Sequence, residues 1–386
     1  MKLVVISSRF PWPLEKGDKL RLYHQVRYLS NDFEICLIAL HDVPVRDEAI
    51  SKLKPYCKEI HLLPISRIDA IFNLFRGRLN GLPAQVSYFY KPGYQSRVDK
   101  IISDFKPDRV YCQLIRVTGY VKEFTIPKTI DYMDCMSLSV LKRASIEKGL
   151  MHLLWKNESR RTAQYEKEIY SYFDHHTAIS QADADAIGFK HIQIIQNGID
   201  ESYLNQLWPS ERDIDLLFLG NLSYFSNVHA VHFLVNEILP LINMPASKII
   251  IAGAHPGNSI KKIINKHVHI ELMANPIDVK SIYARSKIFI APISLGTGQQ
   301  NKILEALACG CAVITSPEVN QGLKIPSEFI RIANNANEYA LQVLELMDTY
   351  PYKNSSRLDA KCWVQDHFSW EKNSKKLIDL ISDSSR

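Results

Sequence analysis

Two doubly wound α/β domains are the fold class that this sequence predicts. Short apolar runs rich in Val, Ile and Leu alternate with amphipathic stretches, and the alternation occurs in both halves of the chain. This pattern is typical of parallel sheets with crossover helices, and continuous apolar runs fit sheets that are covered on both faces. The length of 386 residues agrees with two domains, because a single core rarely grows beyond about 250–300 residues.

Each half has its own series of candidate strands. Those of the first half are 3–7, 34–40, 59–65, 109–115, 128–133, 176–180 and 192–198, and those of the second are 214–220, 248–253, 268–272, 287–293 and 311–316. Helical patterns lie between most of them, for example at 20–30 and 96–105. The polar stretch 201–213 separates the two series. We therefore expect an N-terminal domain at 1–205 and a C-terminal domain at 206–364.

The composition is that of an ordinary globular protein, with 46% hydrophobic and 23% charged residues. No segment reaches the roughly 18 apolar residues that a membrane span needs. The apolar run 3–6 is too short for a signal-peptide core and is better interpreted as a buried strand. The seven cysteines form no CxxC pair, which favours reduced thiols in a cytoplasmic protein.

The excess of six Lys and Arg over Asp and Glu lies wholly within residues 1–200. A basic half beside a neutral half indicates either a domain that meets an anionic surface or substrate, or simply a solvated basic face. No known nucleic-acid motif is present, so we expect no nucleic-acid partner. No GxGxxG follows any strand, which disfavours a dinucleotide-dependent dehydrogenase.

Segment 291–310 is the strongest candidate for a ligand site. A strand ends, a loop with Gly296 and Gly298 follows, and a helix begins near Gln299 and is punctuated by Gly310. Glycines let the backbone approach a ligand closely, and a helix N-terminus offers free N–H groups beside the positive end of the helix dipole. The combination suits a diphosphate, although a plain strand–loop–helix unit would look the same.

Two side chains strengthen this hypothesis. Lys302 lies on the first turn of the helix, where the dipole disfavours a cation unless an anion is nearby. Glu305 follows one turn later, where its carboxylate could accept two hydrogen bonds from a ribose diol. A surface Lys and Glu are the alternative.

Three polar residues of the first half follow strands or precede helices. Asp18 stands before a helical pattern, where it could meet an acceptor hydroxyl or cap the helix. Asp134 could hydrogen-bond an acceptor or cap the helix that follows it. Arg116 could bind a phosphate bidentately or form a structural ion pair.

Taken in order, these segments resemble the family 4 glycosyltransferases, a retaining group with the fold called GT-B. The matching segments are RFPWP (9–13) with KGDKLR (16–21), QLIRV (113–117), DYMD (131–134), Ser180 with NGID (197–200), FLGN (218–221), 291–310 and FSWE (368–371). The resemblance covers nearly the whole chain. It implies two Rossmann-like domains facing across a cleft, with a terminal helix at about 365–386 that crosses back to the first domain.

The resemblance also implies a function. It is the transfer of a sugar from a UDP- or GDP-sugar to a saccharide acceptor, expected to be lipid-linked, with retention of configuration, in cell-envelope polysaccharide or glycolipid biosynthesis. A sugar-nucleotide epimerase of GT-B fold and a non-catalytic sugar-nucleotide binder are the alternatives.

The matching positions give the expected site residues. Lys302, Asp18 and Asp134 are expected to be catalytic, and Lys19, Arg21 and Arg116 to bind the acceptor or a phosphate. The donor is expected to contact Gly17, Gly220, Asn221, Gly296, Thr297, Gly298, Gln299, Gln300, Asn301 and Glu305.

Two departures from the family pattern bear on the chemistry. Thr297 stands where the family often has a first glutamate, so the backbone N–H groups of 296–298 would replace that contact. Residues 221–230 contain no Arg or Lys, which leaves Lys302 as the principal cation for the pyrophosphate, helped by Arg21 or Lys19.

No metal ion and no cofactor are expected. The DID sequence at 213–215 is an Asp-x-Asp pair of the kind that binds metals, but it precedes a strand, at the wrong end of the sheet for a donor.

Two stretches, 67–79 and 138–161, mix Phe, Leu and Trp with Arg and Lys. Such helices suit the surface of anionic lipid, so we expect a peripheral position on the inner face of the cytoplasmic membrane. A core-packed helix with a solvated back is the alternative.

Overall fold

The computed structural model describes residues 1–242, 247–294 and 299–383. The chain divides into two compact units, which are described separately. The first unit comprises Met1–Gln196 and Trp370–Arg386, and the second comprises Asn197–Ser369. The positions predicted at 296–298 lie outside the described residues.

The sheet of the first unit is parallel throughout, with the strand order β3-β2-β1-β4-β5-β6-β7 among the described residues. The strands are β1 (Lys2–Ser7), β2 (Glu34–His41), β3 (Glu59–Pro64), β4 (Arg109–Gln113), β5 (Lys128–Met133), β6 (His175–Ala178) and β7 (Ile192–Ile194). The order reverses between β1 and β4, which makes their carboxyl ends the topological switch point where ligands of doubly wound sheets bind.

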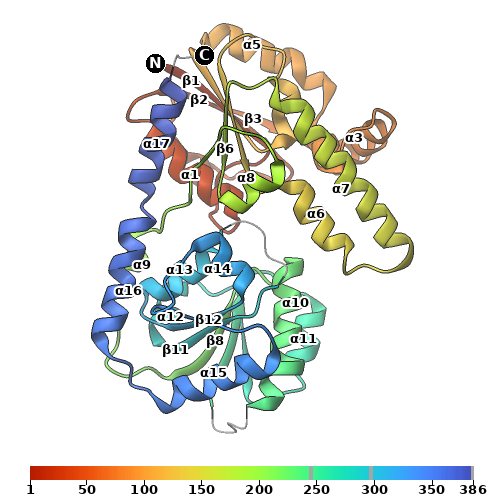
Figure 1. Cartoon of the computed structure of the whole chain (residues 1–386). Coiled ribbons are helices and arrows are strands. Elements are labelled where there is room, and N and C mark those ends of the chain that lie inside the picture. Colours follow the sequence, from red (N-terminus) through yellow and green to blue (C-terminus); the bar gives the residue numbers. More distant parts are fainter. Residues whose placement is uncertain (243–246, 295–298, 384–386) are drawn as a thin grey trace. The chain divides into compact units, whose positions relative to one another are not determined.

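Helices cover both faces of this sheet (Figure 1). Alternate side chains of β1 enter two separate cores: Val4 and Ile6 pack on one face, and Leu3 and Val5 on the other. The helices are α1 (Gly17–Leu29), α2 (Asp47–Leu53), α3 (Arg67–Leu79), α4 (Ala84–Phe89), α5 (Gln95–Phe105), α6 (Met136–Ala144), α7 (Gly149–Tyr170) and α8 (Gln181–Ile187), with short 3₁₀ turns η1 (Pro92–Tyr94) and η2 (Ile115–Tyr120).

The second unit has its own parallel sheet, with the strand order β10-β9-β8-β11-β12-β13 among the described residues. The strands are β8 (Ile214–Leu219), β9 (Ile249–Gly253), β10 (Ile270–Ala274), β11 (Ser286–Ala291), β12 (Ala312–Thr315) and β13 (Ile330–Ile332). Here the order reverses between β8 and β11. The predicted doubly wound fold is therefore confirmed for both halves.

The helical elements of the second unit lie before, between and after these strands along the chain (Figure 1). They are α9 (Glu201–Leu204), α10 (Phe225–Phe233), the π-turn η3 (Leu234–Ile238), the 3₁₀ turn η4 (Leu239–Leu241), α11 (Asn258–Ile264), α12 (Val279–Arg285), α13 (Asn301–Ala308), α14 (Pro317–Leu323), α15 (Ala336–Asp348) and α16 (Asn354–His367).

The boundary between the units lies at 196/197 rather than at the predicted 205/206. Side chains just after the boundary belong to the core of the second unit: Ile199 is buried in it, and Tyr203 and Leu204 pack against it. The backbone N–H of Ile199 donates to the carbonyl of Phe368 at 2.8 Å. The polar composition of 201–213 had suggested a linker, but the chain already packs against the second unit there.

The terminal helix α17 (Trp370–Ser382) belongs to the first unit, as the resemblance implied. Trp370 stacks on His24 of α1 with ring centroids 4.5 Å apart. Leu377 and Ile381 are fully buried in the core that also contains β1 residues Leu3 and Val5. Helix α16, in contrast, packs on α13 of the second unit, so the crossing occurs at 369/370.

Candidate functional site

Lys302 lies at the β8/β11 switch point of the second unit. It is the second residue of α13, and its Nζ donates to Asn227 Oδ1 at 2.5 Å and stands 5.6 Å from the centre of the Phe218 ring. The loss of water around the ammonium lowers its pKa to about 8, with Glu305 opposing the shift. A positive charge is thus held on the first turn of a helix, a position that the helix dipole penalises and that a bound anion would compensate.

Gly220, directly after β8, provides room for this ammonium. A Cβ at this position would lie 3.0 Å from the Lys302 Nζ and 2.9 Å from the Asn227 Nδ2. The next residue, Asn221, makes a local turn, because its Oδ1 accepts from the N–H and hydroxyl of Ser223 at 3.0 and 2.7 Å. Both predicted donor residues therefore lie at the switch point.

Asn227 is a site residue that the sequence reading missed. Its Nδ2 donates to the carbonyl of Asn221 at 2.8 Å while its Oδ1 accepts from Lys302. It therefore fixes the lysine to the end of β8. Residues 221–230 contain no Arg or Lys, and the available signal was a side-chain amide eight residues after the end of β8.

Glu305 lies one turn after Lys302. Burial raises the pKa of this carboxyl to about 7, and the Asp200 charge adds to the rise, whereas the Tyr283 hydroxyl and Lys302 oppose it. Tyr283 donates to Glu305 Oε2 at 3.2 Å. The bond to Tyr283 holds the Glu305 carboxylate in place, and the side chain keeps part of its surface exposed to solvent, so the carboxylate remains accessible.

Helix α13 ends as predicted. Gly310 has a left-handed backbone (φ +73°), the N–H of Cys311 donates to the carbonyl of Ala306, and the N–H of Gly310 donates to that of Leu307. These two hydrogen bonds together form the Schellman motif, which requires a residue that tolerates positive φ.

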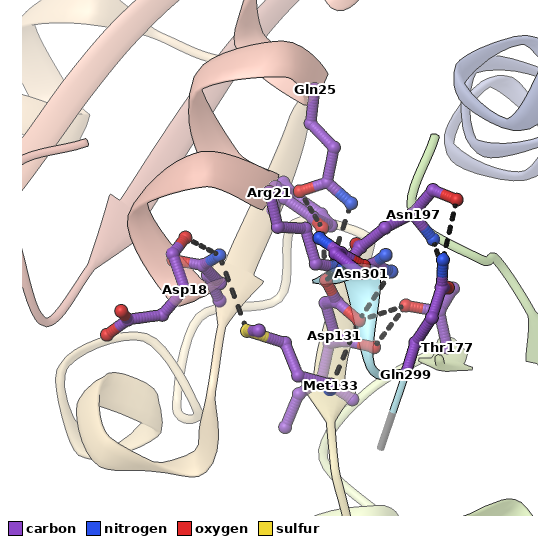
Figure 2. Close-up of polar contacts among 12 residues, drawn as sticks. Asp18, Arg21, Gln25, Asp131, Met133, Thr177, Asn197, Gln299 and Asn301 are labelled. Atoms are coloured by element: carbon purple, nitrogen blue, oxygen red, sulfur yellow. Dashed lines mark hydrogen bonds and ion pairs between the residues drawn. The ribbon is translucent and has the colours of Figure 1, made fainter. Parts of the chain in front are cut away.

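Gln299 and Asn301 have structural partners. The Gln299 side-chain amide accepts from the Asn197 N–H at 2.8 Å and donates to the Asn197 carbonyl at 3.1 Å (Figure 2). Asn301 Oδ1 accepts from Asn197 Nδ2 at 3.4 Å. In this conformation the Gln299 side-chain amide bonds to Asn197 at both ends, and its contact with the donor stays a prediction. Gln300 is the N-cap residue of α13, with no side-chain capping bond.

The Asp-x-Asp pair lies at the opposite end of the sheet, as predicted. Asp215 pairs with Lys287 at 2.6 Å, and Asp213 pairs with Lys248 at 2.9 Å and with Arg285. These carboxylates are neutralised by cations at the amino end of β8.

In the first unit, Asp18 lies at the β1/β4 switch point. Its carboxylate contacts Arg9 at 2.6 Å and Arg116 at 3.5 Å, and its carbonyl accepts from Gln113 Nε2 at 2.8 Å. Burial alone would raise the pKa of Asp18, but the two guanidinium groups hold it below its ordinary value. Asp18 does not cap α1, because the helix begins at Gly17, one residue before it.

The neighbouring glycine and lysine have less defined surroundings. Gly17 is exposed, and a Cβ there would meet nothing within 4 Å. The Lys19 Nζ donates to the carbonyl of Trp12 at 3.1 Å. Both nevertheless lie beside Asp18, at the same end of the sheet.

Arg21 corrects a prediction. It is completely buried and forms a bidentate pair with Asp131, through Nε at 2.6 Å and Nη2 at 3.1 Å (Figure 2). Asp131 also accepts from Tyr111 and Thr177, both at 2.9 Å. The sequence placed Arg21 in the glycine loop, but α1 turns this position inward, so no part of its guanidinium is accessible to a phosphate.

Asp134 follows β5 and precedes α6. Burial raises its pKa well above the ordinary value, and the Asp183 carboxylate raises it further while Arg21 opposes the shift. The N-cap residue of α6 is Cys135, so the alternative of a helix cap does not apply to Asp134.

Among the described residues, three potential metal ligands gather at Cys36, Glu59 and His61, with ligand atoms within 4.8 Å of one another. They lie near the amino ends of β2 and β3, away from the switch point. Burial raises the pKa of the Cys36 thiol to about 12, so the group presents a thiol rather than a thiolate.

Helices α3 and α7 of the first unit carry exposed apolar side chains. Ile68, Ile71, Phe72, Phe75 and Leu79 on α3 are each 67–72% exposed, and Leu150, Leu153 and Leu154 on α7 are 47–71% exposed. Arg161 of α7 donates to the carbonyls of Gly77, Arg78 and Gly81, which joins the two helices. We call these eight side chains the apolar surface. In the ranges that the structure describes, no helix has the length and apolarity to cross a bilayer.

Residues 213–349 match the family model described as Glycosyl transferases group 1. No curated protein sequence matches the chain significantly.

Solved structures match over nearly the whole chain. Sucrose-phosphate synthase from Thermosynechococcus elongatus is 14% identical with a TM-score of 0.73, covering 98% of both chains. HepE from Anabaena, solved with UDP and glucose, is 12% identical with a TM-score of 0.71, covering 99% of both. WaaG, a glycosyltransferase involved in lipopolysaccharide biosynthesis, is 13% identical with a TM-score of 0.65, covering 99% of this chain and 100% of that one. These matches establish the GT-B fold.

Proposed function

We propose, from the match of residues 213–349 to the group 1 glycosyl transferases, that this chain transfers a sugar from a nucleotide-sugar donor to a saccharide acceptor with retention of configuration. The observation that carries the proposal is the pair Lys302 and Glu305 on α13 at the β8/β11 switch point. One side chain supplies a cation for a diphosphate, and the other supplies a carboxylate for a ribose diol. We assign donor binding to the second unit and acceptor binding to the first.

The reaction breaks the bond between the anomeric carbon and the diphosphate oxygen, and the electron pair remains on the diphosphate. The acceptor oxygen forms the new bond on the same face, and its proton passes to the departing diphosphate oxygen. Lys302 and the N–H groups at the start of α13 stabilise the growing negative charge, a role that a positioned cation performs best in the transition state. Asp134 and Asp18 in the first unit are the proposed partners of the acceptor hydroxyl.

We propose that no metal ion takes part. Lys302 supplies the charge that a divalent ion would otherwise provide, and the Asp-x-Asp pair is occupied by Lys248, Arg285 and Lys287. Turnover should then persist in excess chelator. Loss of activity in EDTA that magnesium or manganese restores would contradict this.

The donor is tested by binding. UDP-, GDP- and other nucleotide-sugars are screened by thermal shift, because a ligand that binds the folded state raises its apparent stability. One nucleotide class should stabilise the protein, and Glu305→Ala should weaken its binding by about 1–3 kcal/mol in calorimetry, the usual cost of leaving polar groups unpaired. Lys262→Ala, an exposed lysine on α11, is the matched control. Unchanged affinity in Glu305→Ala would contradict the assignment.

We propose further that the acceptor is lipid-linked and that the apolar surface on α3 and α7 holds the chain at the cytoplasmic face of a membrane, in the assembly of cell-envelope polysaccharide or glycolipid. Exposed Phe, Ile and Leu side chains beside the exposed Arg67, Arg76 and Arg78 fit the boundary of an anionic bilayer.

A further inference from the structure

Lys302 and Glu305, the two charged side chains proposed to bind the donor, lie three residues apart on α13. Side chains at this spacing are neighbours on a helix surface, where a Lys and a Glu can form an ion pair. Such a pair would use both charges, and neither would serve a diphosphate or a ribose. In the part of the chain that the structure describes, each contacts a neutral partner instead: Lys302 donates to Asn227 at 2.5 Å, and Glu305 accepts from Tyr283 at 3.2 Å.

Asn227 is placed to hold the ammonium. It is the third residue of α10 and is only 5% exposed. Its Nδ2 donates to the carbonyl of Asn221 at 2.8 Å, which leaves its Oδ1 facing the Lys302 Nζ. The reverse orientation of the amide would turn two donors, the NH₂ group and the ammonium, toward each other. Asn227 therefore presents a fixed, neutral acceptor from a helix other than α13.

The other neighbours of the ammonium are neutral as well. The Phe218 ring, which is fully buried, has its centre 5.6 Å from the Lys302 Nζ, so it attracts the ammonium without cancelling its charge. A Cβ on Gly220 would lie 3.0 Å from the same Nζ and 3.1 Å from Cγ of Asn227. A larger residue at this position would therefore press on both partners.

The charges of Lys302 and Glu305 nevertheless act on each other. Loss of water is the main cause of both pKa shifts, but Glu305 raises the pKa of Lys302, and Lys302 lowers the pKa of Glu305. Asp200, just before α9, adds a second negative charge that raises the pKa of Glu305. Attraction between the two side chains is thus present, and an acceptor that competes with Glu305 for the ammonium keeps them apart.

We propose that Asn227 is a positioning residue of the donor site, which holds Lys302 away from Glu305 so that both charges stay available to the donor. The inference rests on the proposed function and adds a residue that acts through Lys302 rather than on the donor itself. The neutrality of the amide is part of this role, because a carboxylate in the same place would hold the ammonium and cancel its charge.

The test is a double-mutant cycle between Asn227 and Glu305, measured by titration with inorganic pyrophosphate at about pH 7.5, between the two pKa values. Pyrophosphate carries the charge of a diphosphate but has no diol for Glu305 to bind. Asn227→Ala should weaken its binding about tenfold, because the released ammonium pairs with Glu305. In the Glu305→Gln background the same substitution should weaken binding at most about threefold, because no carboxylate remains to take the ammonium.

Three further variants separate position from charge. Asn227→Gln keeps a neutral amide and should restore part of the affinity. The isosteric Asn227→Asp should weaken pyrophosphate binding about tenfold in both backgrounds, because its own carboxylate cancels the ammonium. Asn258→Ala, at an exposed asparagine of α11 in the same unit, should have no effect.

A second measurement is the pH dependence of nucleoside diphosphate binding. In Asn227→Ala the new ion pair stabilises the charged forms of both Lys302 and Glu305. The acid limb of the profile should therefore move to lower pH and the alkaline limb to higher pH, while the affinity between them falls. Loss of a purely structural hydrogen bond would lower the affinity without moving the limbs apart.

An equal loss from Asn227→Ala in both backgrounds, or no loss in either, overturns the inference and leaves the proposed function intact. Failure of the proposed function looks different: the wild-type protein binds neither pyrophosphate nor a nucleoside diphosphate, Lys302→Ala changes nothing, and the inference falls with it. The unfolding temperature of each variant is measured first. If Asn227→Ala does not fold, the isosteric Asn227→Asp decides, and wild-type affinity of that variant overturns the inference.

Discussion

In the proposed reaction, Lys302 is held in place by the fold and supplies the cation that faces the leaving diphosphate. Its ammonium donates to Asn227, and partial loss of solvation lowers its pKa to about 8. Charge on the leaving diphosphate grows as the glycosidic bond breaks, so the ammonium interacts most strongly in the transition state.

Lys302→Ala should therefore lower kcat by about 10²–10³ while changing the donor KM little. Lys302→Arg should rescue only part of this rate, because a planar fork does not reproduce a point charge. Steady-state kinetics on both variants checks the split, with Lys262→Ala as control and circular dichroism to establish folding. Normal turnover of Lys302→Ala would transfer the charge-neutralising role to Lys19.

The pKa values of Glu305 and Lys302 predict how nucleotide affinity depends on pH. Glu305 must be ionised to accept from a ribose diol, so affinity should rise as the pH passes its pKa of about 7. Lys302 must be protonated to hold the diphosphate, so affinity should fall again above its pKa of about 8. Each limb should approach a tenfold change in the dissociation constant per pH unit.

Calorimetric titrations of a nucleoside diphosphate between about pH 5 and pH 10, roughly two units beyond each pKa, check this profile. Glu305→Gln should remove the acid limb, and Lys302→Met should remove the alkaline limb. Protonation of the ligand phosphate is common to all variants and cancels in the comparison. A profile that is the same in both variants and the wild type would exclude these two groups.

At the scale of elements, the close approach of two strand ends shapes the proposed donor site. A Cβ on Gly253, at the end of β9, would lie 1.7 Å from the carbonyl oxygen of Gly220 after β8. The loop after β8, which carries Asn221 and leads to Asn227, depends on this approach.

Gly253→Ala should therefore destabilise the second unit by several kcal/mol or prevent its folding, because backbone atoms cannot yield as a side chain can. Gly257→Ala is the matched control: it lies four residues away with open space around the site of its Cβ, and should cost about 1 kcal/mol or less. Urea unfolding compares them. Equal midpoints would show that the strand ends can separate.

The apolar surface on α3 and α7 is the proposed contact with lipid. If it meets anionic lipid, the protein should bind anionic vesicles, and binding should weaken with salt, because the Debye length falls to about 8 Å at 0.15 M. The double variant Phe72→Asp with Phe75→Asp should reduce binding at least about tenfold, because two aromatic rings are no longer transferred from water into the bilayer.

Vesicle co-sedimentation measures this. Val268→Asp, a fully exposed apolar residue of the second unit, is the control and should bind as the wild type does. Equal partitioning onto neutral and anionic vesicles would contradict an electrostatic contribution.

For most strands, sequence patterns were sufficient to predict the element. Continuous apolar runs predicted every described strand except β13, whose three residues Ile330–Ile332 are too few to carry a pattern. Strands β4 and β7 end earlier than predicted, at Gln113 and Ile194, because the apolar character continues beyond the paired residues.

For the site, the order of motifs located the switch points but not the partners of each side chain. Arg21 and Gln299 both stand beside glycine-rich segments, yet one is buried against Asp131 and the other is bonded to Asn197. Which way a side chain turns depends on tertiary contacts more than a hundred residues away in sequence, and a single sequence does not reveal them.

On the scale of the whole molecule, the division into two units follows packing rather than composition. Charged and polar residues at 201–213 resembled a linker, but Ile199 and Leu204 already pack in the second unit. The backbone therefore changes units at 196/197 and again at 369/370, and each unit keeps a complete parallel sheet.

The position of α17 has a consequence for biosynthesis. Leu377 and Ile381 complete a core of the first unit, yet they are translated after all of the second unit. At about 5–20 residues per second, the ribosome needs on the order of 10–30 s to pass from Asn197 to Ser369. During that interval the nascent first unit exposes the apolar groove that α17 will fill, and the second unit, whose residues are contiguous, can fold before it. The first unit is therefore the first to be synthesised in part, and the last to complete its core.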